Sequence, residues 1–414
     1  MSNIYLGRYA YPHTYLTKGN YGTPDIIVVL PCHNEPDLLT SLNALELCDR
    51  PEDQVAVIVV INASEKSTPE IKEHNEKTLV DCQFWLGQQP KKYQYHFILE
   101  SELPKKHAGV GLARKIGMDE AVRIFEAQEK DGVILCFDAD STCETNLLIE
   151  VEKIFMDNPK TPGCSIHFEH PLEGDLEPEI YEGILNYELH LRYYVDGLKY
   201  AGFPYAFQTI GSSMAVRSSA YQKQGGMNRR KAGEDFYFLH KIIPLGNFKE
   251  LNTTKIIPSP RRSDRVPFGT GRAIGAWLDE GKVECLSYNH QIYKDLKQLF
   301  SLEGEMYETE TAETVWSDLP VTIQQFVPLE EFIAQISEFK TQANSLTIFR
   351  KRFYQWFDGF KVLKFVHFAR DEFYPNVPIA EGVDWLFETM GMDAKDWDLR
   401  RKLVELRRVD CSDN

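Results

Sequence analysis

Short runs rich in apolar and β-branched residues recur through the first third of the chain, and they constrain the fold more than any other feature. The runs cover residues 26–31, 55–61, 93–100 and 133–137. Such runs are typical of strands that are buried on both faces. Stretches with helical periodicity separate them, as at residues 108–127. The alternation predicts an α/β fold with a mostly parallel sheet and helices on both faces.

The pattern changes beyond residue 165. A helix is expected over about residues 179–195, and from about residue 300 the pattern becomes helical and rich in aromatic residues. A chain of 414 residues is longer than one compact core usually requires. We therefore predict an N-terminal extension (1–24), an α/β domain (25–300) and a helical C-terminal region (301–414).

The composition narrows the class of protein. The net charge of −16 argues against non-specific binding of nucleic acid. No run of about 18 apolar residues occurs, and the N-terminus lacks the pattern of a signal peptide. The eight cysteines form no C-x-x-C pair, so we expect neither a zinc site nor a disulfide framework. Free thiols suit a reducing compartment, and we expect a cytoplasmic protein.

Polar residues follow the predicted strands where each strand ends. His33 and Asn34 follow the first strand, Asn62 follows the second, and Asp138 and Asp140 follow the fourth. In open α/β sheets, ligands bind beyond the carboxyl ends of the strands. These residues therefore predict one ligand site, although any single one could instead be a loop residue or a helix cap.

Asp138 and Asp140 are the strongest candidates for chemistry. In an extended segment, residues i and i+2 point to the same side, and two carboxylates placed so repel each other unless a cation lies between them. Mg²⁺ and Mn²⁺ prefer oxygen ligands and commonly bridge to phosphates. The pair therefore predicts a Mn²⁺ or Mg²⁺ site that binds a diphosphate.

Two other segments carry charged residues at the predicted start of a helix. Gly109 precedes a helix that contains Arg114, an arrangement that suits an anion, although a solvated helix start is the simpler interpretation. Glu234 and Asp235 open an apolar-periodic helix. Acidic residues are favoured there by the helix dipole, but one of these carboxylates could also serve as a general base.

The order of these motifs resembles that of the family 2 glycosyltransferases, whose fold is called GT-A. The resemblance covers about residues 24–250. It rests on LPCHNE (30–35), on HAGVGLARKIG (107–117), on Asp138-Ala-Asp140, on GSSMAVR (211–217), and on Gly225-Gly226 followed by Glu234-Asp235.

The resemblance implies the transfer of a sugar from a nucleotide-diphospho-sugar to an acceptor hydroxyl. Asp138 and Asp140 would bind the metal and the diphosphate. Asp235 would deprotonate the acceptor, with Glu234 beside it, and direct attack would invert the anomeric configuration. The donor would be bound by Pro31, His33, Asn34, Asn62, Gly109, Arg114 and Asp138.

The chain departs from the family pattern in three places. In the family, an acidic residue usually contacts the base of the donor at this position, but this chain has Ile61. The identity of the donor base is therefore left open. Some relatives have a metal-binding histidine beyond the acid pair, for which His240 and His290 are the nearest candidates. The Q-x-x-R-W element of processive, membrane-embedded relatives is missing, so chain polymerisation is not expected.

An arginine-rich segment, residues 259–272, stands in place of that element. Arginine pairs with phosphate through two hydrogen bonds, so the segment could hold the donor diphosphate or a phosphorylated acceptor. A solvated surface loop is the alternative. The arginines concerned are Arg261, Arg262, Arg265 and Arg272.

Residues 347–374 are basic and aromatic, with apolar residues on one face of a predicted helix. This face could make a weak contact with a membrane surface near a lipid-linked acceptor, or it could pack on the rest of the protein.

Two rival functions remain from the sequence. A nucleotidyltransferase uses a similar sheet, but typically with a Gly-rich basic loop after the first strand, where this chain has CHNEPD. The other rival is a non-catalytic module of the same fold that binds a nucleotide sugar.

Overall fold

The computed structural model describes residues 3–16, 21–263, 269–281 and 284–412. The chain forms two compact units. The sheet unit contains Met1–Ile184, Thr209–Gly281 and Arg407–Asn414, and the helical unit contains Leu185–Gln208 and Lys282–Leu406. Each unit is described by itself.

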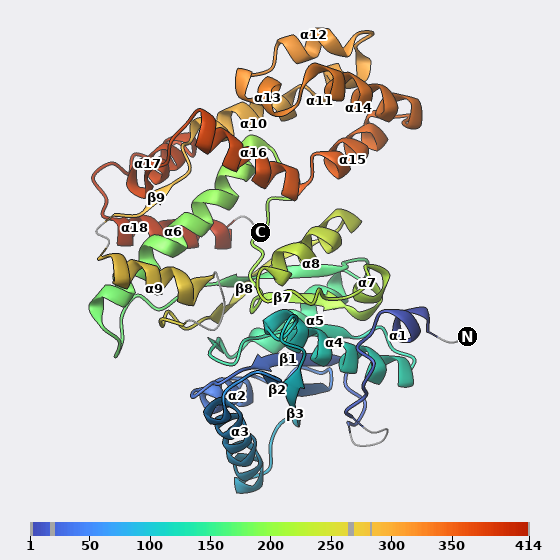
Figure 1. The fold of residues 1–414 in the computed structure, drawn as a ribbon, viewed down its shortest axis with the longest axis vertical. Helices are drawn as coiled ribbons and strands as arrows, with labels where there is room; N and C mark the ends of the chain where they lie inside the picture. Colours follow the sequence, from blue (N-terminus) through green and yellow to red (C-terminus); the bar gives the residue numbers. More distant parts are fainter. Residues whose placement is uncertain (1–2, 17–20, 264–268, 282–283, 413–414) are drawn as a thin grey trace. The chain divides into compact units, whose positions relative to one another are not determined.

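An eight-stranded sheet forms the centre of the sheet unit (Figure 1). Its order is β3-β2-β1-β4-β7-β6-β8-β5. Strands β3, β2, β1 and β4 run parallel, whereas β7 is antiparallel to both neighbours and β5 is antiparallel to β8. The predicted mostly parallel α/β fold is therefore confirmed. The strands are β1 (Ile26–Cys32), β2 (Val55–Ser64), β3 (Gln94–Leu103), β4 (Val133–Cys136), β5 (Thr142–Cys143), β6 (Gly163–Phe168), β7 (Met214–Arg217) and β8 (Lys249–Ile257).

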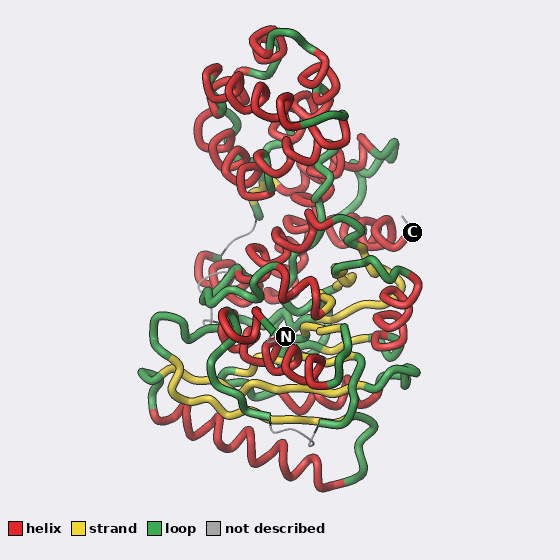
Figure 2. Tube along the Cα trace, turned by 90° about the vertical axis from the view of Figure 1, so that its right-hand side faces the viewer, coloured by secondary structure: helices red, strands yellow, loops and turns green. Residues whose placement is uncertain are grey.

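Helices cover both faces of this sheet (Figure 2). Alternate residues of β1, such as Val28 and Leu30, join a core with α2 (Leu38–Leu47), α3 (Pro69–Gln88) and α5 (Leu147–Asp157). The opposite face of β1 and β2 is covered by α4 (Val110–Ala127). Burial on both faces explains why β1 is apolar at consecutive positions instead of alternating ones.

The first described residues fold onto α4. Tyr5 lies in α1 (Ile4–Arg8), and its hydroxyl donates to Asp119 Oδ1 at 2.6 Å. The backbone N–H of Tyr11 donates to Asp119 Oδ2 at 2.6 Å, and that of Leu16 donates to Glu120 Oε2 at 3.0 Å. The N-terminal segment thus supplies partners for buried carboxylates of α4.

The remaining helices are divided between the two units. The sheet unit also contains α7 (Ser218–Lys223), α8 (Glu234–Ile242), η1 (Ile243–Leu245) and α9 (Thr270–Glu280). Two helices, α6 (Pro178–Ala201) and α18 (Leu399–Ser412), contribute residues to both units. The helical unit contains α10 (Gln291–Ser301), α11 (Glu303–Glu308), α12 (Ala312–Ser317), α13 (Val321–Phe326), α14 (Leu329–Gln342), α15 (Leu346–Trp356), α16 (Gly359–Glu372) and α17 (Ile379–Thr389), with a small ladder of β9 (Leu286–Ser287) and β10 (Val377–Pro378).

The aromatic segment 347–374 forms α15 and α16, and it packs within the helical unit. Phe349, Phe353 and Phe365 are fully buried. The ring of Phe349 contacts that of Tyr307, and Phe365 contacts Phe326. These contacts favour the packing alternative over a membrane contact. Within the described residues, no helix is long and apolar enough to cross a bilayer.

Candidate functional site

The predicted polar residues gather at one edge of the sheet. The parallel strands β2, β1 and β4 are neighbours, so their carboxyl ends meet at the same edge. Asp138 follows β4 after Phe137, whose backbone N–H donates to Val29 O at 3.1 Å. The sheet therefore brings the ends that carry His33, Asn62 and Asp138 to one side of the sheet unit.

The two aspartates of the D-x-D motif lie in a turn and not in an extended strand. Strand β4 ends at Cys136, and the backbone N–H of Ser141 donates to Asp138 O at 3.1 Å. The expectation from strand alternation therefore does not apply, and each carboxylate contacts a different arginine. Asp138 pairs with Arg114, and Asp140 pairs with Arg261.

Arg114 connects the metal-site candidate to the acidic pair of α8. Its side chain is 1% exposed. Its Nη2 lies 2.7 Å from Asp138 Oδ1, and its Nη1 donates to Glu234 Oε1. Arg114 is the fifth residue of α4, whose first turn lies beside the first turn of α8. A predicted donor-binding residue is thus engaged by two carboxylates of the protein itself.

Glu234 and Asp235 are in an environment that disfavours their charged forms. Burial raises the pKa of Glu234 to about 7, with Arg114 opposing the rise and Asp235 adding to it. Burial also raises the pKa of Asp235, and Arg114 opposes this as well. Asp235 accepts hydrogen bonds from the backbone N–H groups of Phe236 and Gly211. A buried carboxylate with a raised pKa is suited to taking up a proton.

Three glycines of the predicted motifs allow close packing around this cluster. A Cβ on Gly109 would lie 2.7 Å from the Cα of Lys231, and one on Gly111 would lie 2.4 Å from Arg230 O. A Cβ on Gly211 would lie 2.8 Å from Arg114 Nη1 and 3.0 Å from Asp235 Oδ2. Gly109, the N-cap of α4, and Gly111, in its first turn, are therefore explained by close packing, while the assignment of Gly109 to donor binding stays a prediction.

Arg261 is the centre of a second group of charges. Its guanidinium donates to Glu35 Oε2, to Asp37 Oδ2 at 2.6 Å and to Asp140 Oδ2 at 3.3 Å. Glu35 and Asp37 lie in the loop between β1 and α2. From the sequence, Glu35 is one of the polar residues after the first strand, with a helix cap as the alternative, and Asp37 is given no role. Two acids directly after the first strand were the signal that could have identified them.

Two further arginines of segment 259–272 lie within the described residues. Arg262 pairs with Asp279 through two hydrogen bonds of 2.6 and 3.0 Å. Arg272 is exposed in the first turn of α9. Arg265 lies outside the described residues. Arg261 thus contacts a predicted site carboxylate, that of Asp140.

The ends of β1 and β2 are joined by a small polar network. His33 Nδ1 lies 2.7 Å from Asn62 O, and Asn75 Nδ2 donates to the same oxygen at 2.9 Å. The backbone of Asn34 has a φ of 48° and donates to Asn75 Oδ1 at 3.0 Å. Pro31 lies in β1 beside this network. Asn75, a buried residue of α3, was not identified from the sequence because it stands among exposed helical residues.

The chemistry of the aspartates fits a hard cation that takes its other ligands from a substrate. Asp138 and Asp140 are 35% and 23% exposed in their side chains and offer carboxylate oxygens. Within the described residues, no group of three or more His, Cys, Asp or Glu side chains could hold a metal. Mg²⁺ is often held by one or two carboxylates with water and phosphate oxygens completing its shell.

Both candidate histidines make contacts within their own unit. His240 Nδ1 donates to Phe236 O of its own helix at 2.8 Å. His290 belongs to the helical unit, where its ring stacks on Trp385 with 5.2 Å between centroids. The structure therefore gives both residues a structural role.

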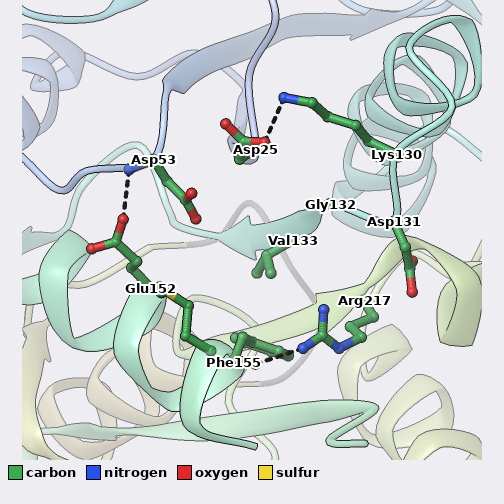
Figure 3. Close-up of a pocket in the computed structure, with 10 residues that line it drawn as sticks. Asp25, Asp53, Lys130, Asp131, Gly132, Val133, Glu152, Phe155 and Arg217 are labelled. Atoms are coloured by element: carbon green, nitrogen blue, oxygen red, sulfur yellow. Dashed lines mark hydrogen bonds and ion pairs between the residues drawn. The ribbon is translucent and has the colours of Figure 1, made fainter. Parts of the chain in front are cut away.

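A pocket of about 240 Å³ lies at the opposite edge of the sheet (Figure 3). Asp25 precedes β1, Val133 begins β4 and Arg217 ends the antiparallel β7, so these residues mark the amino ends of the parallel strands. Lys130 Nζ lies 2.5 Å from Asp25 Oδ1, and Arg217 Nη2 donates to Phe155 O at 2.7 Å. The pocket contains none of the predicted site residues.

Comparison with known proteins gives no family but does give similar solved structures. No protein-family model and no curated protein matches the chain. A structure of S. aureus TarS 1–349 in complex with UDP-GlcNAc is similar, with a TM-score of 0.39 and 12% identity over 93% of this chain and 90% of that one.

A second similar structure is the mannosyltransferase PcManGT from Pyrobaculum calidifontis in complex with GDP-Man and Mn²⁺. It has a TM-score of 0.35 and 13% identity over 94% of this chain and 86% of that one. Likeness at this level carries no donor, metal or acceptor over to this chain.

Proposed function

We propose that this protein is a glycosyltransferase that moves a sugar from a nucleotide-diphospho-sugar to an acceptor hydroxyl. The observation that carries the proposal is the convergence on Arg114. This buried arginine joins Asp138, at the carboxyl end of β4, to Glu234, which is adjacent to Asp235 in α8. The guanidinium of Arg114 therefore contacts Asp138, which is proposed to serve the leaving group, and also Glu234, one of the acidic pair proposed to serve the acceptor.

Asp235 is the proposed base. The attacking hydroxyl must lose its proton as it bonds to the anomeric carbon, and a carboxylate within hydrogen-bond reach can take that proton. The N–H groups of Phe236 and Gly211 fix the carboxylate of Asp235, and Arg114 opposes the effect of burial on its pKa. Glu234 holds Arg114 from the other side. Direct attack would invert the configuration of the sugar.

Asp138 and Asp140 are the proposed ligands of Mn²⁺ or Mg²⁺. When bound, this ion would neutralise the charge of the diphosphate leaving group. Arg261, which contacts Asp140, lies where it could add a further positive charge beside the diphosphate. Pro31, His33, Asn34 and Asn62 are the proposed contacts of the nucleoside, because they form the neighbouring strand ends.

Two variants of the purified protein test the proposal. A thermal-shift screen of nucleotide sugars, with and without Mn²⁺, identifies the donor. Asp235→Asn should bind that donor as the wild type does and lose at least about 100-fold in transfer rate, as expected for removal of a general base. Asp140→Ala should lose the Mn²⁺-dependent part of donor binding.

The screen also separates the rival functions. A module that only binds a nucleotide sugar would show a thermal shift but no transfer in the wild type. A nucleotidyltransferase would respond to a nucleoside triphosphate together with a sugar phosphate and would release pyrophosphate. If no nucleotide sugar shifts the melting temperature, the proposed function is wrong.

A further inference from the structure

Two thiols from distant parts of the sequence lie side by side in the sheet unit. Cys48 is the C-cap of α2, and Cys143 is the last residue of β5. Their sulfur atoms are 3.6 Å apart, although the residues are separated by 95 positions in the chain. Both cysteines are in the thiol form. An S–S bond measures about 2 Å, so a further approach of roughly 1.5 Å would join them.

The backbone on both sides holds the two thiols in this arrangement. The N–H of Asp49, next to Cys48, donates to Thr145 O at 2.6 Å. The carbonyl of Cys48 accepts hydrogen bonds from Lys92 Nζ at 3.0 Å and from the hydroxyl of Tyr93 at 3.1 Å. Cys143 is paired with Ile256 of β8 in the sheet. The proximity of the sulfurs is therefore built into the fold.

The two thiols differ in their exposure to solvent and in the effect of their surroundings on their pKa. Cys143 is partly exposed, whereas Cys48 is 0% exposed. A reagent in solution therefore meets Cys143 first. The hydrogen bond with Cys143 lowers the pKa of the Cys48 thiol, burial opposes this, and the charge of Lys92 adds to the lowering. The same hydrogen bond and burial raise the pKa of the Cys143 thiol, so the exposure of Cys143, and not its acidity, makes it the first to react. A thiolate is the form that attacks a disulfide, so Cys48 is suited to the second step of an exchange.

We propose that Cys48 and Cys143 form a reversible dithiol–disulfide site that small disulfides oxidise. In the first step, Cys143 loses its proton to the alkaline medium, its sulfur bonds to one sulfur of the small disulfide, and the other sulfur leaves as a thiolate. In the second step, the thiolate of Cys48 bonds to Cys143 Sγ and expels the second small thiolate. The two protons lost by the protein thiols end on these two small thiols, and the two electrons reduce the small disulfide.

The bond would join segments that also carry the acidic partners of Arg261. Asp37 caps α2 at the end opposite to Cys48, and Asp140 lies three residues before Cys143. Both carboxylates contact the Arg261 guanidinium. Oxidation would therefore fasten α2 to β5 beside the candidate site. The chemistry of the thiols themselves does not depend on the proposed transferase activity.

The experiment treats the full chain with glutathione disulfide at mildly alkaline pH and maps its peptides by mass spectrometry without reduction. We expect a cross-linked pair of peptides that contain Cys48 and Cys143, with the mass of two hydrogen atoms lost, and its disappearance after treatment with dithiothreitol. The oxidised protein should melt at a higher temperature, because the bond restrains a long segment of the unfolded chain.

Matched variants make the assignment specific. Cys143→Ser and Cys48→Ala should abolish the cross-link and the rise in melting temperature, whereas Cys285→Ser, which removes another partly exposed thiol, should leave both unchanged. A stable glutathione adduct on Cys143 with no cross-link would overturn the proposal, as would a cross-link between other cysteines. Peptide mapping of the wild type decides the matter even if a variant does not fold.

Discussion

Arg114 shows how much one buried residue can determine at the candidate site. Asp138, Glu234 and Asp235 surround its guanidinium. The positive charge of Arg114 opposes the rise in pKa that burial causes in Glu234 and Asp235. The sequence places Arg114 near the start of a helix, where a cation is usually solvated. Its burial could not be predicted, because its partners come from segments 24 and 120 positions away.

Replacing Arg114 tests this account. Arg114→Met should lower the free energy of unfolding by about 3 kcal/mol, because it leaves the buried carboxylate of Glu234 and the partly exposed carboxylate of Asp138 without their positive partner. Arg114→Lys should lose less, since one charge remains. Urea denaturation of each variant measures these differences. Arg262→Met is the control: it breaks the exposed pair with Asp279 and should change stability by less than about 1 kcal/mol. Equal losses from Met substitution at both positions would contradict the account.

Glu169 offers a prediction for pH. Burial raises its pKa, but hydrogen bonds from His167 and Lys255 and the charge of Arg407 outweigh burial and lower it from the usual 4.5 to about 2. A pKa that is lower in the folded state contributes stability above the unfolded value, and this contribution is lost as the pH falls from about 4.5 to about 2.

Glu169→Gln measures that contribution. The carboxylate is partly exposed, so solvent screening reduces its expected contribution to about 1 kcal/mol at neutral pH. The difference in unfolding free energy between wild type and variant should be present at pH 7 and should shrink as the pH approaches 2. A difference that stays constant over this range would show that Glu169 stabilises the fold by packing instead of charge.

At the scale of elements, the sequence predicts the strands that have a continuous apolar run, and it misses features that depend on which strands pair. The apolar runs that form β1, β2 and β4 were identified because burial on both faces makes them continuous. The two-residue β5 and the antiparallel course of β7 were not identified, since a short strand has no periodicity and its direction is set by distant neighbours. The D-x-D segment is expected to be extended, but β4 ends at Cys136 and the segment forms a turn in which Ser141 N–H donates to Asp138 O.

The packing of α4 on the sheet supplies a prediction for an element. Gly117 faces β1 and β2, and a Cβ there would lie 2.5 Å from Val29 Cγ1 and 3.2 Å from Val60 Cγ2. Gly117→Ala should therefore lower the free energy of unfolding by about 1–3 kcal/mol through overpacking, although alanine favours a helix.

Gly87→Ala in α3 is the matched control. A Cβ on Gly87 meets no atom within 4 Å, so alanine should leave stability unchanged or raise it by up to about 1 kcal/mol. Thermal melts of the two variants should move in different directions. A Gly117→Ala protein as stable as the wild type would show that α4 can shift away from the sheet at no cost.

At the scale of the whole molecule, the two units are built from segments that alternate along the chain. The helical unit is built from residues 185–208 and 282–406, and the last residues return to the sheet unit. There Arg407 Nη2 donates to His170 O at 2.8 Å, and Asn252 Nδ2 donates to Asp410 O at 2.6 Å. The sequence alone predicts a domain boundary near residue 300, because the residue pattern becomes helical there. No pattern in the sequence shows that the end of the chain returns to the sheet unit.

A truncation after residue 300 tests which division the protein obeys. It would remove the C-terminal partners of the sheet unit and would expose α6 residues such as Tyr193, whose ring contacts Trp385. We therefore expect the 1–300 chain to be less stable and more readily cleaved by protease than the full chain. A second chain lacking only residues 407–414 isolates the contribution of the returning segment. A 1–300 chain that melts cooperatively at the temperature of the full protein would establish an independent α/β domain ending at residue 300.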